Sequence, residues 1–589
     1  MFYDFECFKY NWMVVLIDPE KEEPYVVVDD QDRLAKIYEE YKHDIWIGFN
    51  SRHYDQYILK AILCGLSAWE CNDWIINKHQ PGWLFSEMMR EIFLINYDVM
   101  PLNNSLKQLE GFQGHNIHES SVDFTIDRPL TEDEINETIT YCTNDVEETI
   151  NVFMENINDF KALLWLVTEF GFPLSYMSKT KAQISAEILE CVKTERDDEW
   201  DLSVLPCIKL IDKKRWLTVK RKKKKGEPSR EDKRVGKVFM TPDEWFLTKD
   251  YQDYSLYFET VVCGVEHTLA WGGIHGGLKK YHYRCDSTHL MIHVDVASYY
   301  PRLMIFHKLL TRSAKKPEKF KEIYERRIAL KRAGKKKEQA PLKIVINGTY
   351  GICKDEMSKA YDARNANLVC VNGQLMLLDL IEHLAMIDSF ELIQSNTDGL
   401  IIKIHRDDFN LVDDVCYEWE SRCNMELEFD YIEEIWQKDV NNYIFRQFDG
   451  KIERKGAYVK DLSSMDNDLP ILNKALNDYM LNGTPVEDTI NGCNELMMFQ
   501  KISKLTGNYE YVTHNGKKYT NKCYRIFASL DESDGPVKKV KKDRSDKFAN
   551  TSLNSFIENG DITGVKVPSK LDKEWYIGEA RKRLEQYGC

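Results

Sequence analysis

The chain has 589 residues, of which 43% are hydrophobic and 30% charged, and its formal net charge is −16. This length excludes a single core and predicts several domains, and the lack of any run of about 20 apolar residues argues against a membrane span. The first residues, MFYDFECF, lack the basic and apolar regions of a secretory signal peptide, so the sequence predicts a cytoplasmic protein.

Two further features of composition bear on function. The fifteen cysteines include no Cys-x-x-Cys pair, which predicts free thiols rather than zinc or iron–sulfur ligands. Although the net charge is negative, the chain contains three basic stretches, at 213–226, 331–337 and 538–544. Each is either a solvated loop or a local groove for phosphate backbones. The net charge therefore does not exclude nucleic acid as a partner.

Strands and helices alternate through the first 165 residues. FYDF, WMVVLID, YVVV and IWIGF indicate short strands, while 31–42 and 131–153 have helical spacing. Thr131 and Glu134 have capping-box spacing at the start of the second helix. The sequence therefore predicts an α/β domain here.

The later elements are less regular. The region 195–260 holds the longest basic run and gives no clear pattern. HLMIHVDV (289–296) and LIIKIH (400–405) indicate strands, and 318–337 indicates a charged helix. The last 120 or so residues contain Gly-Asn turns, a basic loop and a final helix. This pattern predicts a separate C-terminal subdomain.

Several carboxylates in the N-terminal domain form a recognisable series. Asp4 and Glu6 point to the same face of a strand, where they repel each other unless a cation lies between them. Asp55 follows a strand-to-helix junction, and Tyr141 and Asp145 lie one helical turn apart. Taken separately, each is more often a helix cap or a surface pair.

In this order, within an α/β domain, these residues resemble the three exonuclease motifs of DnaQ-like, RNase H-fold proofreading domains. The resemblance implies two Mg²⁺ ions, which Mn²⁺ can replace, held by Asp4, Glu6, Asp55 and Asp145. One ion would activate the attacking water and the other would stabilise the leaving 3′-oxygen. It also implies that Tyr141 orients the water and that DNA contacts Asn50, Tyr54 and Lys107, although Lys107 is otherwise a solvated lysine.

The stretch HVDVASYYP contains one carboxylate, Asp295, in an apolar segment, and a buried strand keeps such a group for a metal ion, a salt bridge or a turn. It resembles motif A of the family B DNA polymerases, D-x-x-S-L-Y-P, with Tyr299 in place of Leu. KIVINGTYG (343–351) resembles motif B with Gly348 in place of Ser, SNTDGLII (395–402) occupies the place of motif C, and KGAY (455–458) resembles a later Lys…Tyr element. The order and separations fit over essentially the whole chain.

This second resemblance implies a two-metal centre for phosphoryl transfer, with Asp295 and Asp398 contributed by neighbouring strands. It implies a finger-like helical hairpin with a basic turn at AGKKKEQAP (333–341), and a tyrosine, Tyr300, under the incoming sugar. The implied nucleotide-binding residues are Ser298, Tyr300, Arg327, Lys331, Lys343, Asn347 and Tyr350. GGIHGG (272–277) stands in place of a Y-x-G-G linker whose glycines let the backbone approach phosphate, so the implied DNA contacts here are His275, Gly276, Gly277, Lys455 and Tyr458.

The sequence departs from the family pattern in motif C, where Asn396 replaces the first Asp and Gly399 replaces Ser. The two carboxylates to which the family assigns metal binding are kept, so we expect an active polymerase. The intervals from Asp295 to Lys343 and from Gly351 to Asn396 are too short for the added subdomains of protein-primed members. A nucleic-acid primer is therefore expected.

The sequence thus predicts an α/β plus α+β multidomain protein. It is expected to consist of an RNase H-like exonuclease domain followed by a right-hand polymerase with palm, short fingers and thumb. The predicted segments are 1–165 (exonuclease), 166–288 (linker and basic insert), 289–310 and 351–460 (palm), 311–350 (fingers with motif B) and 461–589 (thumb).

The predicted function is template-directed DNA synthesis with 3′–5′ proofreading, in phage-type replication within an infected bacterial host. The expected partners of this monomer are primer-template DNA, dNTPs and a single-strand-binding protein or helicase–primase. The alternatives are a 3′–5′ exonuclease with a degenerate polymerase half and a non-catalytic DNA-binding scaffold.

Overall fold

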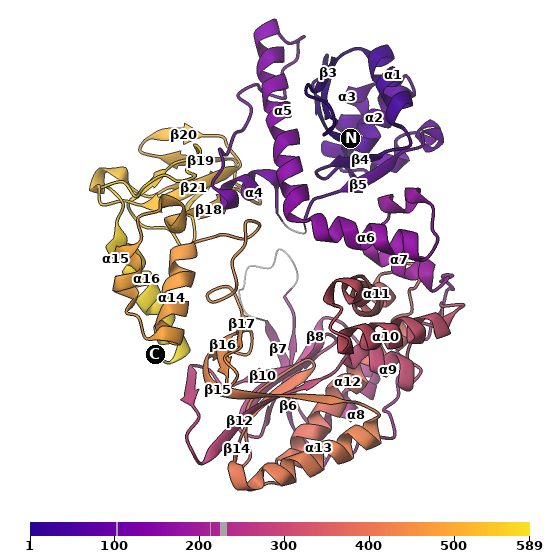
Figure 1. Ribbon diagram of the computed structural model, residues 1–589, viewed down its shortest axis with the longest axis vertical. Helices are drawn as coiled ribbons and strands as arrows, with labels where there is room; N and C mark the ends of the chain where they lie inside the picture. Colours follow the sequence, from indigo (N-terminus) through magenta and orange to yellow (C-terminus); the bar gives the residue numbers. More distant parts are fainter. Residues whose placement is uncertain (102–103, 212–213, 224–231) are drawn as a thin grey trace. The chain divides into compact units, whose positions relative to one another are not determined.

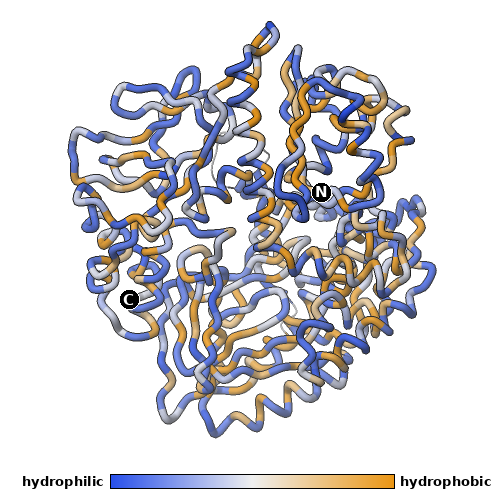
Figure 2. The backbone as a smooth tube through the Cα atoms, turned by 45° about the horizontal axis from the view of Figure 1, so that its top comes forward, coloured by the Kyte–Doolittle hydropathy of each residue, from blue (hydrophilic) through white to orange (hydrophobic). Residues whose placement is uncertain are grey.

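The computed structural model describes residues 1–101, 104–211, 214–223 and 232–589, and the chain forms two compact units (Figure 1). Unit 1 comprises Met1–Thr180, Leu462–Ala475 and Thr484–Ala580, and unit 2 comprises Lys181–Asp461, Leu476–Gly483 and Arg581–Cys589. Both units are mixed α/β. Segments of hydrophobic residues alternate along the chain with segments of hydrophilic residues (Figure 2).

Unit 1 is built on a five-stranded sheet in the order β3-β2-β1-β4-β5. The strands are β1 (Phe2–Cys7), β2 (Trp12–Ile17), β3 (Tyr25–Val28), β4 (Ile45–Gly48) and β5 (Ile95–Asp98). The first three strands are antiparallel, whereas β1, β4 and β5 run parallel. The strands predicted within the first 50 residues are therefore all present, in one sheet.

Helices cover both faces of this sheet because its strands are apolar on both sides. One hydrophobic cluster joins the sheet to α1 (Gln31–Tyr41), α2 (Asp55–Leu63) and α3 (Ala68–Ile76). A second joins the opposite face to α4 (Leu106–Gln113) and α5 (Glu132–Glu155).

The start of α5 confirms the predicted capping box. The backbone N–H of Thr131 donates to Glu134 Oε2 at 2.8 Å, and the backbone N–H of Glu134 donates to Thr131 Oγ1 at 3.3 Å. These two bonds satisfy donors that the first turn of a helix leaves without partners.

The C-terminal part of unit 1 contains two small sheets. One has the order β18-β21-β24, with β18 (Lys501–Lys504), β21 (Cys523–Ala528) and β24 (Ser555–Ile557). The other has the order β20-β19-β22-β23, with β19 (Tyr511–His514), β20 (Lys517–Tyr519), β22 (Lys538–Lys541) and β23 (Arg544–Lys547). The basic stretch 538–544, expected as a loop, thus lies in a β-hairpin.

This C-terminal part packs directly on the N-terminal part of the same unit. The guanidinium of Arg525, fully buried, donates to the carbonyl oxygens of Gly111 at 3.3 Å and His115 at 2.7 Å. Ile502 and Cys523 belong to the same apolar cluster as Leu109. This packing was not predicted, because 461–589 was expected to form a separate subdomain.

Unit 2 is built on a twelve-stranded sheet in the order β17-β16-β15-β12-β14-β13-β10-β9-β8-β6-β7, with β11 paired to β15. The strands are β6 (Arg215–Arg221), β7 (Lys233–Met240), β8 (Leu256–Val262), β9 (Val265–Ala270), β10 (Gly273–Gly277), β11 (Tyr281–Arg284), β12 (His289–Val296), β13 (Glu391–Asn396), β14 (Gly399–His405), β15 (Leu427–Asp439), β16 (Asn442–Gln447) and β17 (Ile452–Lys455). Its helices include α9 (Tyr299–Phe306), α12 (Ala363–Leu384) and α13 (Phe409–Cys423).

The unclear region 195–260 extends this sheet. Much of its basic run lies in strand β6, where Leu217 and Val219 are buried, while Thr218 between them is half-buried and Trp216 before them is exposed. This alternation has the strand period of two, but the lysines on either side hid it from a reading of composition. The rest of the basic run, 224–226, lies outside the described residues.

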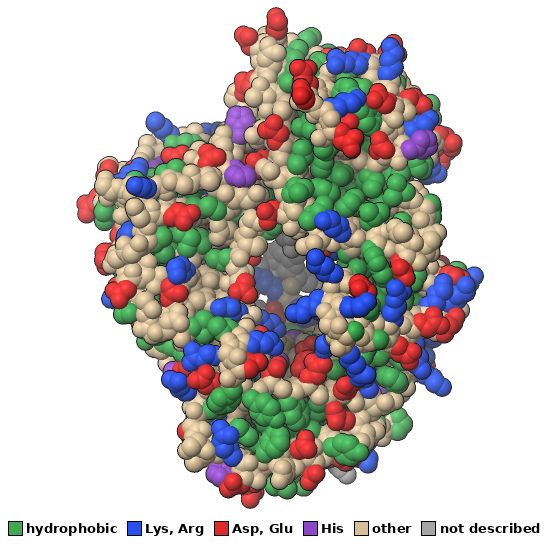
Figure 3. Space-filling view, in the orientation of Figure 1, with side chains coloured by type: hydrophobic (Ala, Val, Ile, Leu, Met, Phe, Trp, Pro, Cys, Tyr) green, Lys and Arg blue, Asp and Glu red, His purple; other side chains and the backbone are tan. Residues whose placement is uncertain are grey.

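The predicted helical hairpin is present, with different limits. Helix α10 spans Pro317–Arg332 and α11 spans Lys336–Lys354, so the helix expected to reach 337 ends five residues earlier. Gly334, at φ +71°, adopts the left-handed conformation that ends a helix. The turn expected over 333–341 is correspondingly shorter, because α11 already contains Pro341 near its start. Lys and Arg side chains gather over these two helices (Figure 3).

All fifteen cysteines are free thiols. Within the described part of the chain, no helix combines the length and apolar character needed to span a bilayer.

Candidate active sites

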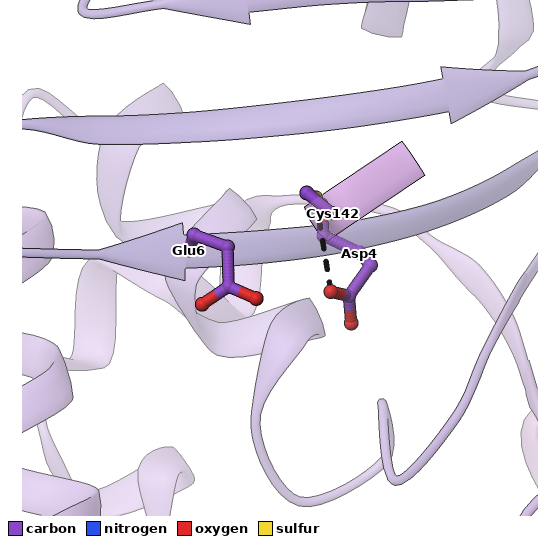
Figure 4. A group of neighbouring side chains, drawn as sticks. All are labelled: Asp4, Glu6 and Cys142. Carbon is purple, nitrogen blue, oxygen red and sulfur yellow. Dashed lines mark hydrogen bonds between the residues drawn. The ribbon is translucent and has the colours of Figure 1, made fainter. Parts of the chain in front are cut away.

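Unit 1 gathers the predicted exonuclease carboxylates on one face of its sheet. Asp4 and Glu6 project from the same side of β1 (Figure 4). Asp55 begins α2, and its Oδ1 accepts a 3.1 Å hydrogen bond from the backbone N–H of Phe5, which ties that helix to β1. Asp145 is buried on α5, which packs against the same strand.

These carboxylates perturb one another strongly. Burial, followed by the charges of Asp55, Glu6 and Asp145, raises the pKa of Asp4 well above its usual range. Burial and the charges of Asp145 and Asp55 do the same to the pKa of Glu6, and burial raises the pKa of Asp55 to about 7. Because ionised carboxylates are disfavoured here without a counter-charge, the cluster suits a divalent cation. Its hard oxygen donors fit Mg²⁺.

Lys107 supplies one positive charge to this cluster. Its ammonium forms ion pairs with Asp145 and, at 2.8 Å, with Glu110, and its side chain is only 12% exposed. The alternative of a solvated lysine is therefore wrong. Glu110, which the sequence did not single out, is fully buried, and burial raises its pKa to about 8 against the opposing charge of Lys107.

Two neighbours on α5 complete the cluster. The ring of Tyr141 lies 4.8 Å from the Lys107 ammonium, and burial followed by the charge of Asp145 raises the pKa of its hydroxyl. The thiol of Cys142 donates to the backbone oxygen of Asp4 at 3.3 Å. Burial raises the pKa of this thiol well above its usual range, so Cys142 acts as a hydrogen-bond donor rather than a thiolate ligand. Cys142 was not predicted at the site, although it lies inside the third exonuclease motif.

The two residues expected to contact a 3′ end differ in their surroundings. Asn50 is exposed in a left-handed conformation, at φ 59°, and its backbone N–H donates to Asp98 at 2.9 Å. Tyr54 is half-buried, and its hydroxyl donates to Asn72 Oδ1 at 2.8 Å. The side chain of Asn50 is therefore accessible, whereas the Tyr54 hydroxyl already has a partner.

Unit 2 brings Asp295 and Asp398 to one edge of its sheet. Asp295 on β12 is paired with Gly399, the first residue of β14, and with Glu428 on β15. Asp398 lies in the two-residue turn between β13 and β14, preceded by Thr397 at φ 36°. Among the residues that the structure describes, Asp295 forms no salt bridge, which removes one of the three explanations for its presence in an apolar strand.

Further carboxylates surround this pair. Burial, followed by the charges of Asp398, Glu428, Glu453 and Asp430, raises the pKa of Asp295 to about 7. These last three acidic residues were not predicted at the site, although the alternation in LEFDY places Glu428 and Asp430 on one strand face. The centre remains strongly acidic despite Asn396 in motif C, and its carboxylate donors also fit Mg²⁺.

One cavity of unit 2, about 410 Å³ in volume, is lined by residues from all three polymerase-like motifs. It contains both Asp295 and Asp398. The predicted nucleotide-binding residues that line it are Ser298, Tyr300, Arg327, Lys331, Lys343, Asn347 and Tyr350. Every nucleotide-binding residue expected from the sequence therefore faces the same space.

The cavity walls are held by specific contacts. Arg327 Nη1 donates to Ser298 Oγ at 3.0 Å, and Ser298 itself has a left-handed backbone at φ 54°, an uncommon conformation for a residue other than glycine. The rings of Tyr300 and Tyr350 lie 4.6 Å apart. Lys331, expected at the triphosphate, pairs with Glu428 at 2.8 Å.

The other two basic and polar residues predicted at the nucleotide come from motif B. Lys343 and Asn347 are exposed one turn apart on α11. Their spacing places them on the same helix face, which is the face that the cavity reaches.

Most of the segment GGIHGG is a strand of the sheet. Gly273–Gly277 forms strand β10, in which His275 is paired with Asn396 and its Nε2 lies 3.0 Å from Thr397 Oγ1. A Cβ atom at Gly276 would lie 2.4 Å from the buried ring of His267. Close packing of the His267 ring against Gly276 therefore requires a small residue at this position.

The Lys…Tyr element lies near the same acidic edge. Lys455 ends β17 and lines a cavity of about 320 Å³ together with Asp295 and Asp398. The ring of Tyr458 faces the Lys438 ammonium at 4.7 Å and the Arg583 guanidinium at 4.4 Å.

Comparison with protein-family models gives no match, and comparison with curated proteins gives none either. Among solved structures, the chain is similar to a family B DNA polymerase from the hyperthermophilic archaeon Pyrobaculum calidifontis. The identity is 13% and the TM-score 0.39, over 100% of this chain and 77% of that chain.

Proposed function

We propose that the chain is a DNA-directed DNA polymerase with a 3′–5′ proofreading exonuclease. The single observation that supports the polymerase activity is the 410 Å³ cavity of unit 2, since it is lined by residues from three segments that are far apart in the sequence. Unrelated surface residues would have no reason to converge in this way.

The side chains of that cavity suggest how the reaction proceeds. Asp295 and Asp398 would hold Mg²⁺, which when bound neutralises charge on the attacking and leaving oxygens of an in-line displacement. Arg327 and Lys343 would bind the triphosphate through charge-assisted hydrogen bonds. Tyr300, packed against Tyr350, would lie under the sugar and exclude a 2′-hydroxyl.

For the exonuclease, Asp4, Glu6, Asp55 and Asp145 would hold Mg²⁺, and Lys107 and Tyr141 would position the phosphate and the attacking water. The raised pKa values of Asp4 and Glu6 support this role, because they record a site short of positive charge. Several further residues would contact the DNA backbone or its 3′ end. They are Asn50, Tyr54, His275, Gly277, Lys455 and Tyr458.

The wider context is part of the same proposal. The protein would act as a monomer in phage-type DNA replication inside an infected bacterium, with a nucleic-acid primer and a single-strand-binding protein or helicase–primase as partners. DNA would be held mainly by phosphate contacts, so binding should weaken steeply with salt.

The test is a gel assay on a 5′-labelled primer-template with Mg²⁺, with and without the four dNTPs. We expect primer extension to be lost in Asp295→Ala and kept in Asp4→Ala/Glu6→Ala. Primer shortening should be lost in Asp4→Ala/Glu6→Ala and kept in Asp295→Ala. Shortening without extension, also under Mn²⁺, would leave only the exonuclease. Neither activity, together with intact DNA binding, would leave a scaffold.

A further inference from the structure

His293 has a ring nitrogen that lacks a hydrogen-bond partner among the described residues of unit 2. Its Nδ1 is buried and unpartnered, and the oxygen of its nearest acidic neighbour, Asp430 Oδ2, is 3.7 Å away, beyond hydrogen-bonding distance. The whole side chain is only 15% exposed. A buried polar atom in this state requires an explanation, of which an absent ion is one.

The sheet brings two carboxylates to this imidazole. His293 on β12 is paired directly with Asp430 on β15, so their side chains share a face. Glu453 on β17 reaches the same place from the far side of β16, where it is paired with Phe445. One ligand atom from each of His293, Asp430 and Glu453 lies within 4.8 Å of the other two.

This spacing is close to that of a metal site. Three ligand atoms at about 2.1 Å from one ion are about 3.0–3.6 Å apart from one another, so side-chain rotations that move these atoms by about an ångström would complete the site. A cation pulling on all three groups supplies the force for such a movement.

There is also room for an ion. The three residues line the cavity of about 320 Å³ that contains Asn396 and Lys455. Gln394, which is 2% exposed, lines it too, and its Oε1 has no hydrogen-bond partner. Gly399 keeps the imidazole accessible, because a Cβ atom there would lie 3.2 Å from His293 Nε2.

We propose that His293, Asp430 and Glu453 bind a divalent transition-metal ion beside the Asp295–Asp398 pair. An imidazole with two carboxylates suits Zn²⁺, Fe²⁺ or Mn²⁺ better than Mg²⁺, which prefers oxygen ligands only. The ion would offset part of the negative charge at this edge of the sheet. These three ligands differ from those proposed for the polymerase and exonuclease centres, although they share a cavity with Asp295 and Asp398, and binding of this ion does not depend on either activity.

The competing explanation is a protonated His293 paired with Asp430 and no metal. The two can be separated with Mn²⁺, whose electron spin detects a directly bound nitrogen by electron spin-echo modulation. The full chain would be titrated with MnCl₂ in a large excess of MgCl₂, so that Mg²⁺ occupies the carboxylate-only sites. The variants are His293→Gln, Glu453→Gln and Asp295→Asn, and the matched control is His289→Gln, a half-buried histidine on the same strand that pairs with Asp286.

We expect one tightly bound Mn²⁺ with nitrogen modulation in the wild type, the His289→Gln control and Asp295→Asn. His293→Gln should lose the modulation, and Glu453→Gln should weaken this Mn²⁺ about tenfold or more, since even partners behind the ligands contribute that much. Nitrogen modulation that persists in His293→Gln, or its absence from a correctly folded wild type, would overturn the proposal. Glu453→Gln, on the short strand β17, provides a test even where His293→Gln fails to fold.

Discussion

Lys107 offers a direct test of the electrostatics of the unit 1 site. We consider the change Lys107→Met, which keeps the length and apolar part of the side chain and removes its charge. The ammonium now compensates Asp145, whose side chain is 11% exposed, and Glu110, whose side chain is fully buried. Removing one partner of a buried ion pair costs about 3–5 kcal/mol, because the remaining charge is left without compensation.

The loss should depend on pH, and its sign follows from the pKa values. With Lys107 present, the pKa of Glu110 is already raised by burial to about 8, and burial also raises that of Asp145. Without Lys107, the pKa values of Glu110 and Asp145 rise further. The folded variant therefore holds more protons than its unfolded chain over a wider range of pH. The stability of Lys107→Met relative to wild type should therefore fall as the pH rises from 6 to 8 through Asp145, and Glu110 should add to this loss above its wild-type pKa of about 8.

Hydrogen exchange of peptides from α5 measures this in the intact chain. At pH 8 we expect exchange about a hundredfold faster than in wild type, which corresponds to about 3 kcal/mol at 1.36 kcal/mol per tenfold change. At pH 6 the difference should be at least several-fold smaller. The matched control is Lys36→Met, an exposed lysine on α1. Equal exchange in the two variants at pH 8, or a larger difference at pH 6, would refute the reasoning.

Three other predictions concern unit 2. Gly276→Ala places a Cβ 2.4 Å from the His267 ring and should lower the unfolding free energy by about 1–3 kcal/mol in denaturant titrations. The control is Gly272→Ala, whose Cβ would have no described atom within 4 Å. Equal stability of the two variants would contradict the packing argument. Because the pKa of Asp295 is raised to about 7, mainly by burial, protons compete with Mg²⁺ below that pH. The Mg²⁺ concentration for half-maximal primer extension should therefore fall as the pH rises from 6 to 7 and level off by 8, whereas a value independent of pH would count against Asp295 as a ligand. Tyr300→Ala should raise incorporation of ribonucleotides relative to deoxyribonucleotides about tenfold or more in single-nucleotide extension assays, and an unchanged ratio would remove Tyr300 from the sugar site.

The local elements of both units could be predicted because their signals are short-range. The capping box at Thr131 and Glu134 depends on residues three apart, and the strand period of HLMIHVDV is contained within eight residues. The hairpin of α10 and α11 was predicted too, but its turn was placed too broadly. Gly334 alone ends the first helix, and Pro341 is accommodated within the second.

The supporting residues of each site could not be predicted in the same way. Glu110 and Cys142 matter because α4 and α5 pack on one face of β1, and no spacing within either helix reveals that packing. Asp430 and Glu453 surround Asp295 only because β15 is paired with β12 and the sheet continues through β16 to β17. Such pairings join residues more than 130 positions apart in the chain, from Asp295 to Glu428.

The sequence by itself determined which groups are proposed to react, because the order of carboxylates from Asp4 to Asp398 and the motif residues around them are contained in the linear chain. The tertiary structure decided the charge state of those groups, since burial and through-space neighbours set the pKa of Asp295, and neither exists in the linear chain. The tertiary structure also determined that residue 276 must be small and that Asp430 faces His293. Side chains that touch across a sheet become neighbours through strand pairing and not through proximity in sequence.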